Sequence, residues 1–227
     1  MDKKLVARYF LREVMGLAIM GAALFVSAGT IVWWAAWAVL GIMAVWTTAT
    51  ALVIISSNPT LLAERLGPRQ GAKSWDLAIL SLLGLSQLAR YIIAGLDQRF
   101  GWTGEISLTL QLVAFILCVL GYAMVVWATA ANTFFSQIVR IQTERDHTVV
   151  TNGPYRFIRH PGYAGAVVYE LFVSVLLTSW WALFVSMLNV VLLIIRTLLE
   201  DRTLQAELSG YAEYTHKVRY RLLPGVW

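Results

Sequence analysis

The sequence predicts an all-α fold, a polytopic membrane helix bundle with about six apolar segments. Apolar residues make up 59% of the 227 positions and charged residues only 14%, whereas a soluble domain has about 45–50% and about 25%. Two stretches, residues 14–57 and 106–138, contain no Asp, Glu, Lys or Arg. Because a spanning helix needs roughly 20 apolar residues, both stretches are long enough to cross a membrane.

Turn-forming residues divide the apolar sequence into segments. The six expected segments are about 14–30, 33–56, 75–96, 106–131, 163–178 and 180–199. The breaks lie at Ser27, Gly29 and Thr30, at Asn58-Pro59, at Gly67-Pro68 and Gly71, at Gly101 and Gly104, and at Thr178-Ser179. The second segment is expected to end at Asn58, because a residue before proline is disfavoured in a helix. The last two segments are short, so they form either a tilted hairpin or two full crossings.

The basic residues indicate which side of the membrane each loop faces. With the N-terminus in the cytoplasm, all of the 18 Lys and Arg residues except Arg90 and Arg99 fall on the cytoplasmic side, as the positive-inside rule requires. The sequence therefore predicts a multi-pass integral membrane protein with both termini in the cytoplasm. Arg90 lies within a span, where we expect it to snorkel or to pair, with Asp97 as the nearest acid along the chain.

The remaining composition argues against several kinds of partner. The net charge of +5 is explained by orientation in the membrane and by contact with anionic membrane lipids, so no nucleic acid is expected. One cysteine, Cys118, and three histidines do not make a metal site, so no metal is expected. Glu170 lies inside the fifth segment, and we interpret it mainly as a structural hydrogen-bonding residue.

The loop before the fifth segment and the end of the sixth carry the polar residues that could perform chemistry. Four motifs stand out there: His147-Thr148-Val149-Val150, Gly153-Pro154-Tyr155, Arg159-His160-Pro161-Gly162-Tyr163 and Arg196-Thr197-Leu198-Leu199-Glu200. Their composite pattern, over about residues 140–227, resembles the isoprenylcysteine carboxyl methyltransferase family and its relatives among phospholipid methyltransferases. The resemblance implies a cofactor-binding methyltransferase core at 132–227, which forms one membrane domain with the N-terminal transmembrane helices of 1–131.

The resemblance also implies the residues of the site. S-adenosyl-L-methionine would bind in a cytoplasmic pocket closed by loop 132–162 and the C-terminal tail. The residues that would bind it are Gln142, His147, Thr148, Val149, Val150, Tyr155, His160, Pro161, Gly162, Tyr163 and Glu200. Arg196 would bind the acceptor, and Arg196 with Glu200 would form the catalytic edge. The sequence departs from the family pattern in a thinner acidic run, Glu200 and Asp201, and in a shorter linker between Gln142 and His147.

Methyl transfer suits these residue types. The reaction is an in-line displacement that needs no metal, and holding donor and acceptor in line can supply about 7–11 kcal/mol. The resemblance implies a lipid or lipid-like acceptor of the isoprenylcysteine carboxylate type, and an arginine can bind such a carboxylate through two hydrogen bonds. Three alternatives stay open: a phospholipid N-methyltransferase, a membrane NADPH-dependent reductase of the sterol-reductase type, and a non-enzymatic transporter or scaffold.

Overall fold

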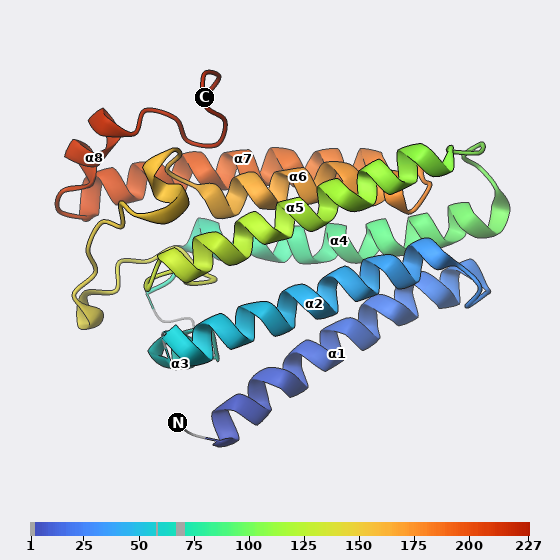
Figure 1. The fold of residues 1–227 in the computed structure, drawn as a ribbon, viewed down its shortest axis with the longest axis horizontal. Coiled ribbons are helices and arrows are strands. Elements are labelled where there is room, and N and C mark those ends of the chain that lie inside the picture. Colours follow the sequence, from blue (N-terminus) through green and yellow to red (C-terminus); the bar gives the residue numbers. More distant parts are fainter. Residues whose placement is uncertain (1–2, 58, 67–70) are drawn as a thin grey trace.

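The computed structural model describes residues 3–57, 59–66 and 71–227, and these residues form helices and loops without a strand (Figure 1). The predicted breaks at Asn58 and Gly67-Pro68, and the predicted cytoplasmic residue Arg69, lie outside the described residues. Within them, the all-α membrane bundle predicted from composition is confirmed.

The described residues form six apolar helices, as the segment analysis predicted. Their bounds are α1 Lys3–Ala28, α2 Trp34–Ser57, α4 Ser74–Phe100, α5 Leu108–Ala131, α6 Pro161–Leu176 and α7 Trp180–Glu207. All except α6 are long and apolar enough to cross a membrane, and α6 is a shorter apolar helix of 16 residues. Shorter helices are α3 Pro59–Leu66 and α8 Tyr211–Lys217, with 3-10 turns η1 Thr143–Arg145 and η2 Gly153–Arg156.

Two helices extend further than the apolar pattern indicated. The first helix starts at Lys3 rather than near residue 14, and the last long helix continues to Glu207 rather than ending near 199. In both cases the added turns carry charged residues. Many charged residues favour the helix, but a search for apolar runs leaves them out. The added turns project beyond the apolar layer at one end of the bundle.

The helical pair α6 and α7 spans the full height of the bundle. Ser179, in the turn between them, donates a hydrogen bond from Oγ to Asp97 Oδ2 at the end of α4 (2.5 Å). The backbone N–H of Trp180 donates to Thr103 Oγ1 in the α4–α5 loop (3.1 Å). The turn between α6 and α7 therefore lies at the same end of the bundle as the α4–α5 loop. This is the position expected if the two helices make two full crossings rather than a tilted hairpin.

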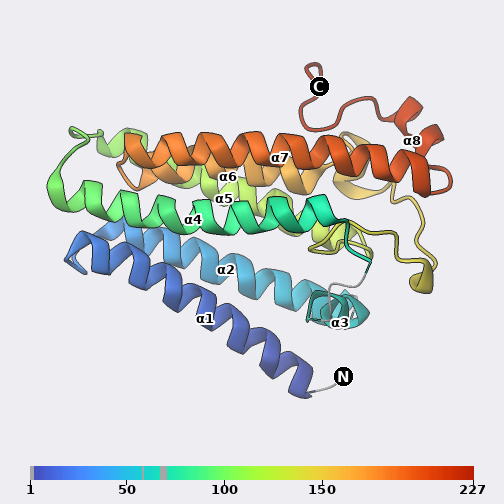
Figure 2. The ribbon, with the colours of Figure 1, turned by 180° about the vertical axis from the view of Figure 1, so that it is seen from behind.

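The polar segments gather at the opposite end. The start of α1, helix α3, the loop 132–160, the end of α7 and helix α8 all lie there, and we call this the polar end (Figures 1 and 2). Most of the described basic residues that were predicted to share one side of the membrane belong to these segments. Towards the polar end, α1 and α2 diverge from α4 and α7 (Figure 1).

Close backbone packing holds α6 against α5. A Cβ atom added at Gly121 would lie 2.7 Å from the carbonyl oxygen of Gly165, and one at Gly165 would meet the Gly121 carbonyl oxygen more closely still. Small residues of this kind allow membrane helices to approach each other. The approach fixes the start of α6, and with it the motif residues that begin this helix.

The buried arginine of α4 is paired, but not with the acid that the sequence suggested. Arg90 is fully buried, and its NH1 donates to Glu170 Oε2 of α6. Asp97 instead accepts from Thr103 and Ser179. The pairing of Arg90 with Asp97 was wrong because residues seven apart on one helix lie about 10 Å apart along its axis, whereas α6 packs beside Arg90.

Candidate active site

A cavity of about 520 Å³ is lined by residues of the polar end and by residues further along the helices. Its walls come from α2, α3, α4, α5, α6, α7, α8 and the loop 132–160. The predicted site residues that line it are His147, Thr148, Val149, Val150, Tyr155, His160, Gly162, Tyr163, Arg196 and Glu200. The cavity therefore brings together the loop motifs and the end of α7, which lie far apart in the sequence.

Two predicted cofactor residues lie behind the cavity wall. Gln142 is 1% exposed; its Nε2 donates to the Phe134 carbonyl oxygen (2.8 Å), and its Oε1 accepts from Arg145 NH1 (2.5 Å). Pro161 is the first residue of α6, where a missing N–H costs nothing. In this structure Gln142 therefore holds the loop together through its side-chain hydrogen bonds, and Pro161 starts helix α6.

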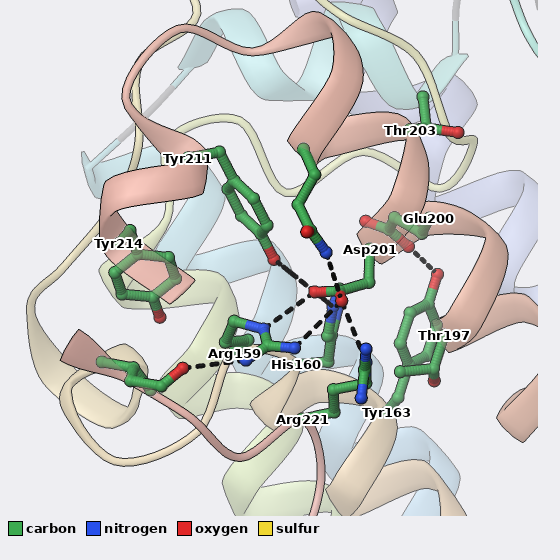
Figure 3. Close-up of polar contacts among 12 residues, drawn as sticks. Arg159, His160, Tyr163, Thr197, Glu200, Asp201, Thr203, Tyr211, Tyr214 and Arg221 are labelled. Carbon is green, nitrogen blue, oxygen red and sulfur yellow. Dashed lines mark hydrogen bonds and ion pairs between the residues drawn. The ribbon is translucent and has the colours of Figure 1, made fainter. Parts of the chain in front are cut away.

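Asp201 is the centre of a buried network that joins the loop, α7 and the tail (Figure 3). Its carboxylate is 1% exposed and accepts from Arg159 Nε (2.8 Å) and NH2 (2.9 Å) and from Arg221 Nε (2.9 Å). It also lies 3.1 Å from His160 Nε2 and from Tyr211 Oη. The tail is held further by backbone bonds from Arg159 and His160 to the carbonyl oxygens of residues 220 and 221. His160 is therefore held at the cavity wall by Asp201, a residue to which the sequence assigned no role.

Glu200 points away from this network. Residues adjacent on a helix differ by about 100° in direction, so Glu200 faces α6 and the cavity while Asp201 faces the tail (Figure 3). The hydroxyl of Tyr163 donates to Glu200 Oε2. Among the described residues no hydrogen bond reaches Oε1 of Glu200, so this oxygen is available to a ligand.

Arg196 is bound to an acid from another helix. Its Nε donates to Asp76 Oδ1 (2.6 Å) and its NH2 to the Gln137 carbonyl oxygen (2.9 Å), while its Cζ lies 5.2 Å from the centre of the Tyr163 ring. Asp76, which is fully buried in the first turn of α4, also accepts from the backbone N–H of Val139 (2.8 Å). In the described part of the chain no ion pair joins Arg196 to Glu200. Of its five N–H groups, the two on NH1 have no partner among these residues.

The polar loop holds a neutral imidazole and a buried phenol. Burial, with the nearby charges of Arg145 and Arg140, lowers the pKa of His147 to about 4. The His147 ring lies 4.4 Å from the ring of Phe134. Burial also raises the pKa of Tyr155, whose hydroxyl accepts a hydrogen bond from Asn132 Nδ2 (3.2 Å). Near neutral pH the loop therefore offers uncharged, partly aromatic surfaces to the cavity.

Comparisons with known proteins show which sequences this chain is similar to. The sequence model of the isoprenylcysteine carboxyl methyltransferase (ICMT) family matches residues 112–206. A probable protein-S-isoprenylcysteine O-methyltransferase of Oryza sativa subsp. indica is 24% identical over 141 residues, which cover 59% of this chain and 71% of the relative. Protein-S-isoprenylcysteine O-methyltransferase A of Arabidopsis thaliana is 30% identical over 104 residues, 45% of this chain and 49% of the relative.

A solved structure shares the fold. The structure of the eukaryotic intramembrane Ras methyltransferase ICMT superposes with a TM-score of 0.52 at 18% identity, covering 92% of this chain and 73% of that one. The N-terminal helices, which carry no recognisable motif, are therefore part of a shared arrangement. The match of residues 112–206 to this family model, the named relatives and the apolar helices together indicate that the chain is an integral-membrane methyltransferase.

Proposed function

We propose that the protein transfers the methyl group of S-adenosyl-L-methionine to a lipid or lipid-like acceptor of the isoprenylcysteine carboxylate type. The observation that carries the proposal is the single cavity shared by the loop motifs 147–163 and by Arg196 and Glu200 of α7. The family names support the chemistry, and they favour methyl transfer over the reductase and scaffold interpretations.

The residues around the polar end of the cavity fit such a cofactor, which supplies a methyl group activated by a positive sulfur. The free Oε1 of Glu200 can accept from an ammonium or hydroxyl group. Neutral His147, with the backbone of Thr148–Val150, offers hydrogen bonds without adding positive charge beside a cation. Aromatic side chains such as Tyr155 and Tyr163 suit flat or cationic groups, and the closing tail limits the access of water.

Arg196 can offer fewer hydrogen bonds to an acceptor than the sequence suggested. Asp76 and Gln137 occupy Nε and NH2, so a carboxylate cannot form the paired hydrogen bonds of an unpartnered guanidinium. It can bind only the two N–H groups of NH1. Because Asp76 also neutralises the charge of Arg196 while Glu200 lies nearby, a phospholipid amine is the second candidate acceptor.

We place the polar end in the cytoplasm, because it carries nearly all of the Lys and Arg residues. The acceptor would then reach the site from the membrane, while S-adenosyl-L-methionine would enter from the aqueous side. Membrane lipids and the prenylated or lipid-like acceptor are the proposed partners.

Binding of S-adenosylhomocysteine tests the cofactor assignment. A ligand at 100 times its dissociation constant adds about 2.7 kcal/mol to stability, which corresponds to a rise of about 5–11 °C in Tm for a chain of this size. Glu200→Gln should lose most of this rise. The matched control is Glu207→Gln on the same helix, since Glu207 forms an exposed pair with Lys73, and it should keep the rise.

Transfer of label tests the acceptor. The purified protein is incubated with methyl-labelled S-adenosyl-L-methionine and either an S-farnesylcysteine derivative or a total lipid extract. Base-labile label on the farnesylcysteine identifies a methyl ester, whereas base-stable label on a phospholipid identifies an N-methyl product. Lack of both labelled products, together with an unchanged Tm, would refute the proposal.

A further inference from the structure

The cavity continues into the membrane-spanning layer and meets a second group of polar side chains. Arg90 of α4 and Glu170 of α6 form an ion pair there, and Asn189 Nδ2 donates to the same Glu170 oxygen, Oε2 (2.8 Å). Glu170 lines the cavity, and among the described residues no hydrogen bond reaches its Oε1. The ion pair balances the charges of its two members but leaves one carboxylate oxygen for another donor.

Three further polar groups line the same part of the cavity without a hydrogen bond to any residue the structure describes. They are the amide of Gln87 in α4, the hydroxyl of Tyr122 in α5 and the indole N–H of Trp46 in α2, which is buried. The Trp46 ring stacks on Tyr122 at 4.6 Å between centres. Unpaired polar groups cost free energy where water is absent, so four of them around one cavity indicate a ligand that bonds to them.

This inner cluster, Trp46, Gln87, Tyr122 and Glu170, lies apart from the polar end. Glu170 follows Tyr163 by seven residues on α6, which is about 10 Å along the helix axis. Gln87 precedes Arg90 by three residues on α4, so it lies within one turn of the ion pair. A molecule whose reacting group lies beside Arg196 and Glu200 would place its apolar body at this depth.

A role in helix packing alone does not account for the cluster. The Arg90–Glu170 pair does join α4 to α6, and buried pairs can serve to fix such a register. That role requires neither a cavity beside Glu170 nor exposure of the Gln87 amide on a membrane-spanning helix. The close contact of Gly121 and Gly165 already fixes α6 against α5.

We propose that the inner cluster binds a neutral hydrogen-bonding group, a hydroxyl or an amide, carried by the apolar body of the methyl acceptor. The group is neutral because Arg90 already balances the charge of Glu170. The inference rests on the proposed function and narrows it: the preferred acceptor is not a plain hydrocarbon chain but one with a polar group about 10 Å from the methylated end.

Two probes test this directly: N-acetyl-S-farnesylcysteine and the same molecule with a hydroxyl on its second isoprene unit. Dissociation constants are measured by thermal shift of the full chain in detergent, with and without S-adenosylhomocysteine. The wild-type protein should bind the hydroxylated probe about tenfold more tightly. Gln87→Leu and Trp46→Phe should bring this ratio towards one by weakening the binding of the hydroxylated probe.

Ser81→Ala is the matched control on α4. Ser81 is exposed, and its hydroxyl donates to the Leu77 carbonyl oxygen of its own helix (2.8 Å), so its loss should keep the tenfold ratio. Equal binding of the two probes by the wild type, no binding of either, or an unchanged ratio in both variants would overturn the inference. Failure of S-adenosylhomocysteine to bind would refute the proposed function instead, and the probe ratio would still decide the inference.

Discussion

Replacing Asp201 by asparagine should make the polar end unfold more readily than it does in the wild-type protein. The asparagine keeps the shape of the side chain and one acceptor oxygen but removes the charge. Arg159, only 6% exposed, would lose its buried counter-ion, and Arg221 would lose an ion pair. Breaking a buried ion pair by removing one partner costs about 3–5 kcal/mol, which is a fall of about 6–20 °C in Tm.

The neighbouring acid provides the comparison. Glu200→Gln keeps an acceptor oxygen for the hydroxyl of Tyr163 but replaces a charged acceptor by a neutral one, which should cost about 1 kcal/mol or about 2–4 °C. The two variants should also differ in ligand response, because Glu200 faces the cavity and Asp201 faces the tail. Thermal unfolding of both proteins in one detergent, with and without S-adenosylhomocysteine, measures each effect.

Two results would contradict this division of roles. The first is an Asp201→Asn protein that melts within about 2 °C of the wild type. The second is a Glu200→Gln protein that is the less stable of the two and yet keeps its full response to S-adenosylhomocysteine. The first result would mean that the network around Asp201 does not hold the tail against the bundle, and the second would mean that Glu200 stabilises the fold rather than binds the cofactor.

Three further predictions concern other parts of the molecule. Asp76→Asn should release Arg196 and lower turnover about 10- to 100-fold, while the dissociation constant of S-adenosylhomocysteine changes little. Asp76→Glu should recover part of the lost turnover. A fall in the affinity for S-adenosylhomocysteine as large as the fall in turnover would refute this prediction. The pKa of His147 is lowered to about 4 in the folded protein, so between that pH and about 6.5 the unfolded chain binds more protons than the folded one. The free energy of unfolding, measured by denaturation at several pH values, should therefore fall as the pH drops through this window. The fall should be smaller in His147→Gln. A cysteine at Ser209, with Cys118 replaced by alanine, should react with a membrane-impermeant thiol reagent in inverted vesicles, where the cytoplasmic face is outside. Reaction of this cysteine in intact cells would contradict the predicted topology.

The fold and the cavity-lining motifs could be predicted because they depend on local patterns. Apolar runs of about the right length define spanning helices, and the loop motifs are contiguous in the sequence. The extra turns at Lys3 and before Glu207 could not be found this way, because charged helical turns outside the membrane resemble ordinary loops in composition.

The acids that organise the site could not be predicted for a different reason. Asp76 binds Arg196 across 120 positions, and Asp201 binds Arg159 across 42. Neither separation leaves a periodic signal, since both pairs form only when the helices pack. An acid in the first turn of an apolar helix, as Asp76 is, is the one local sign that could have drawn attention to it.

The shortness of α6 has a consequence for how the protein is made. This helix has 16 residues and carries Glu170, so it has the weakest tendency of the six apolar helices to enter a bilayer by itself. The partners that compensate for this, Arg90 and Gly121, belong to helices synthesised before it. Because segments leave the ribosome in order, α4 and α5 can already be in the membrane when α6 emerges. Loss of either contact should therefore hinder membrane insertion of α6. It should reduce the amount of inserted protein rather than the catalytic rate of the molecules that do assemble.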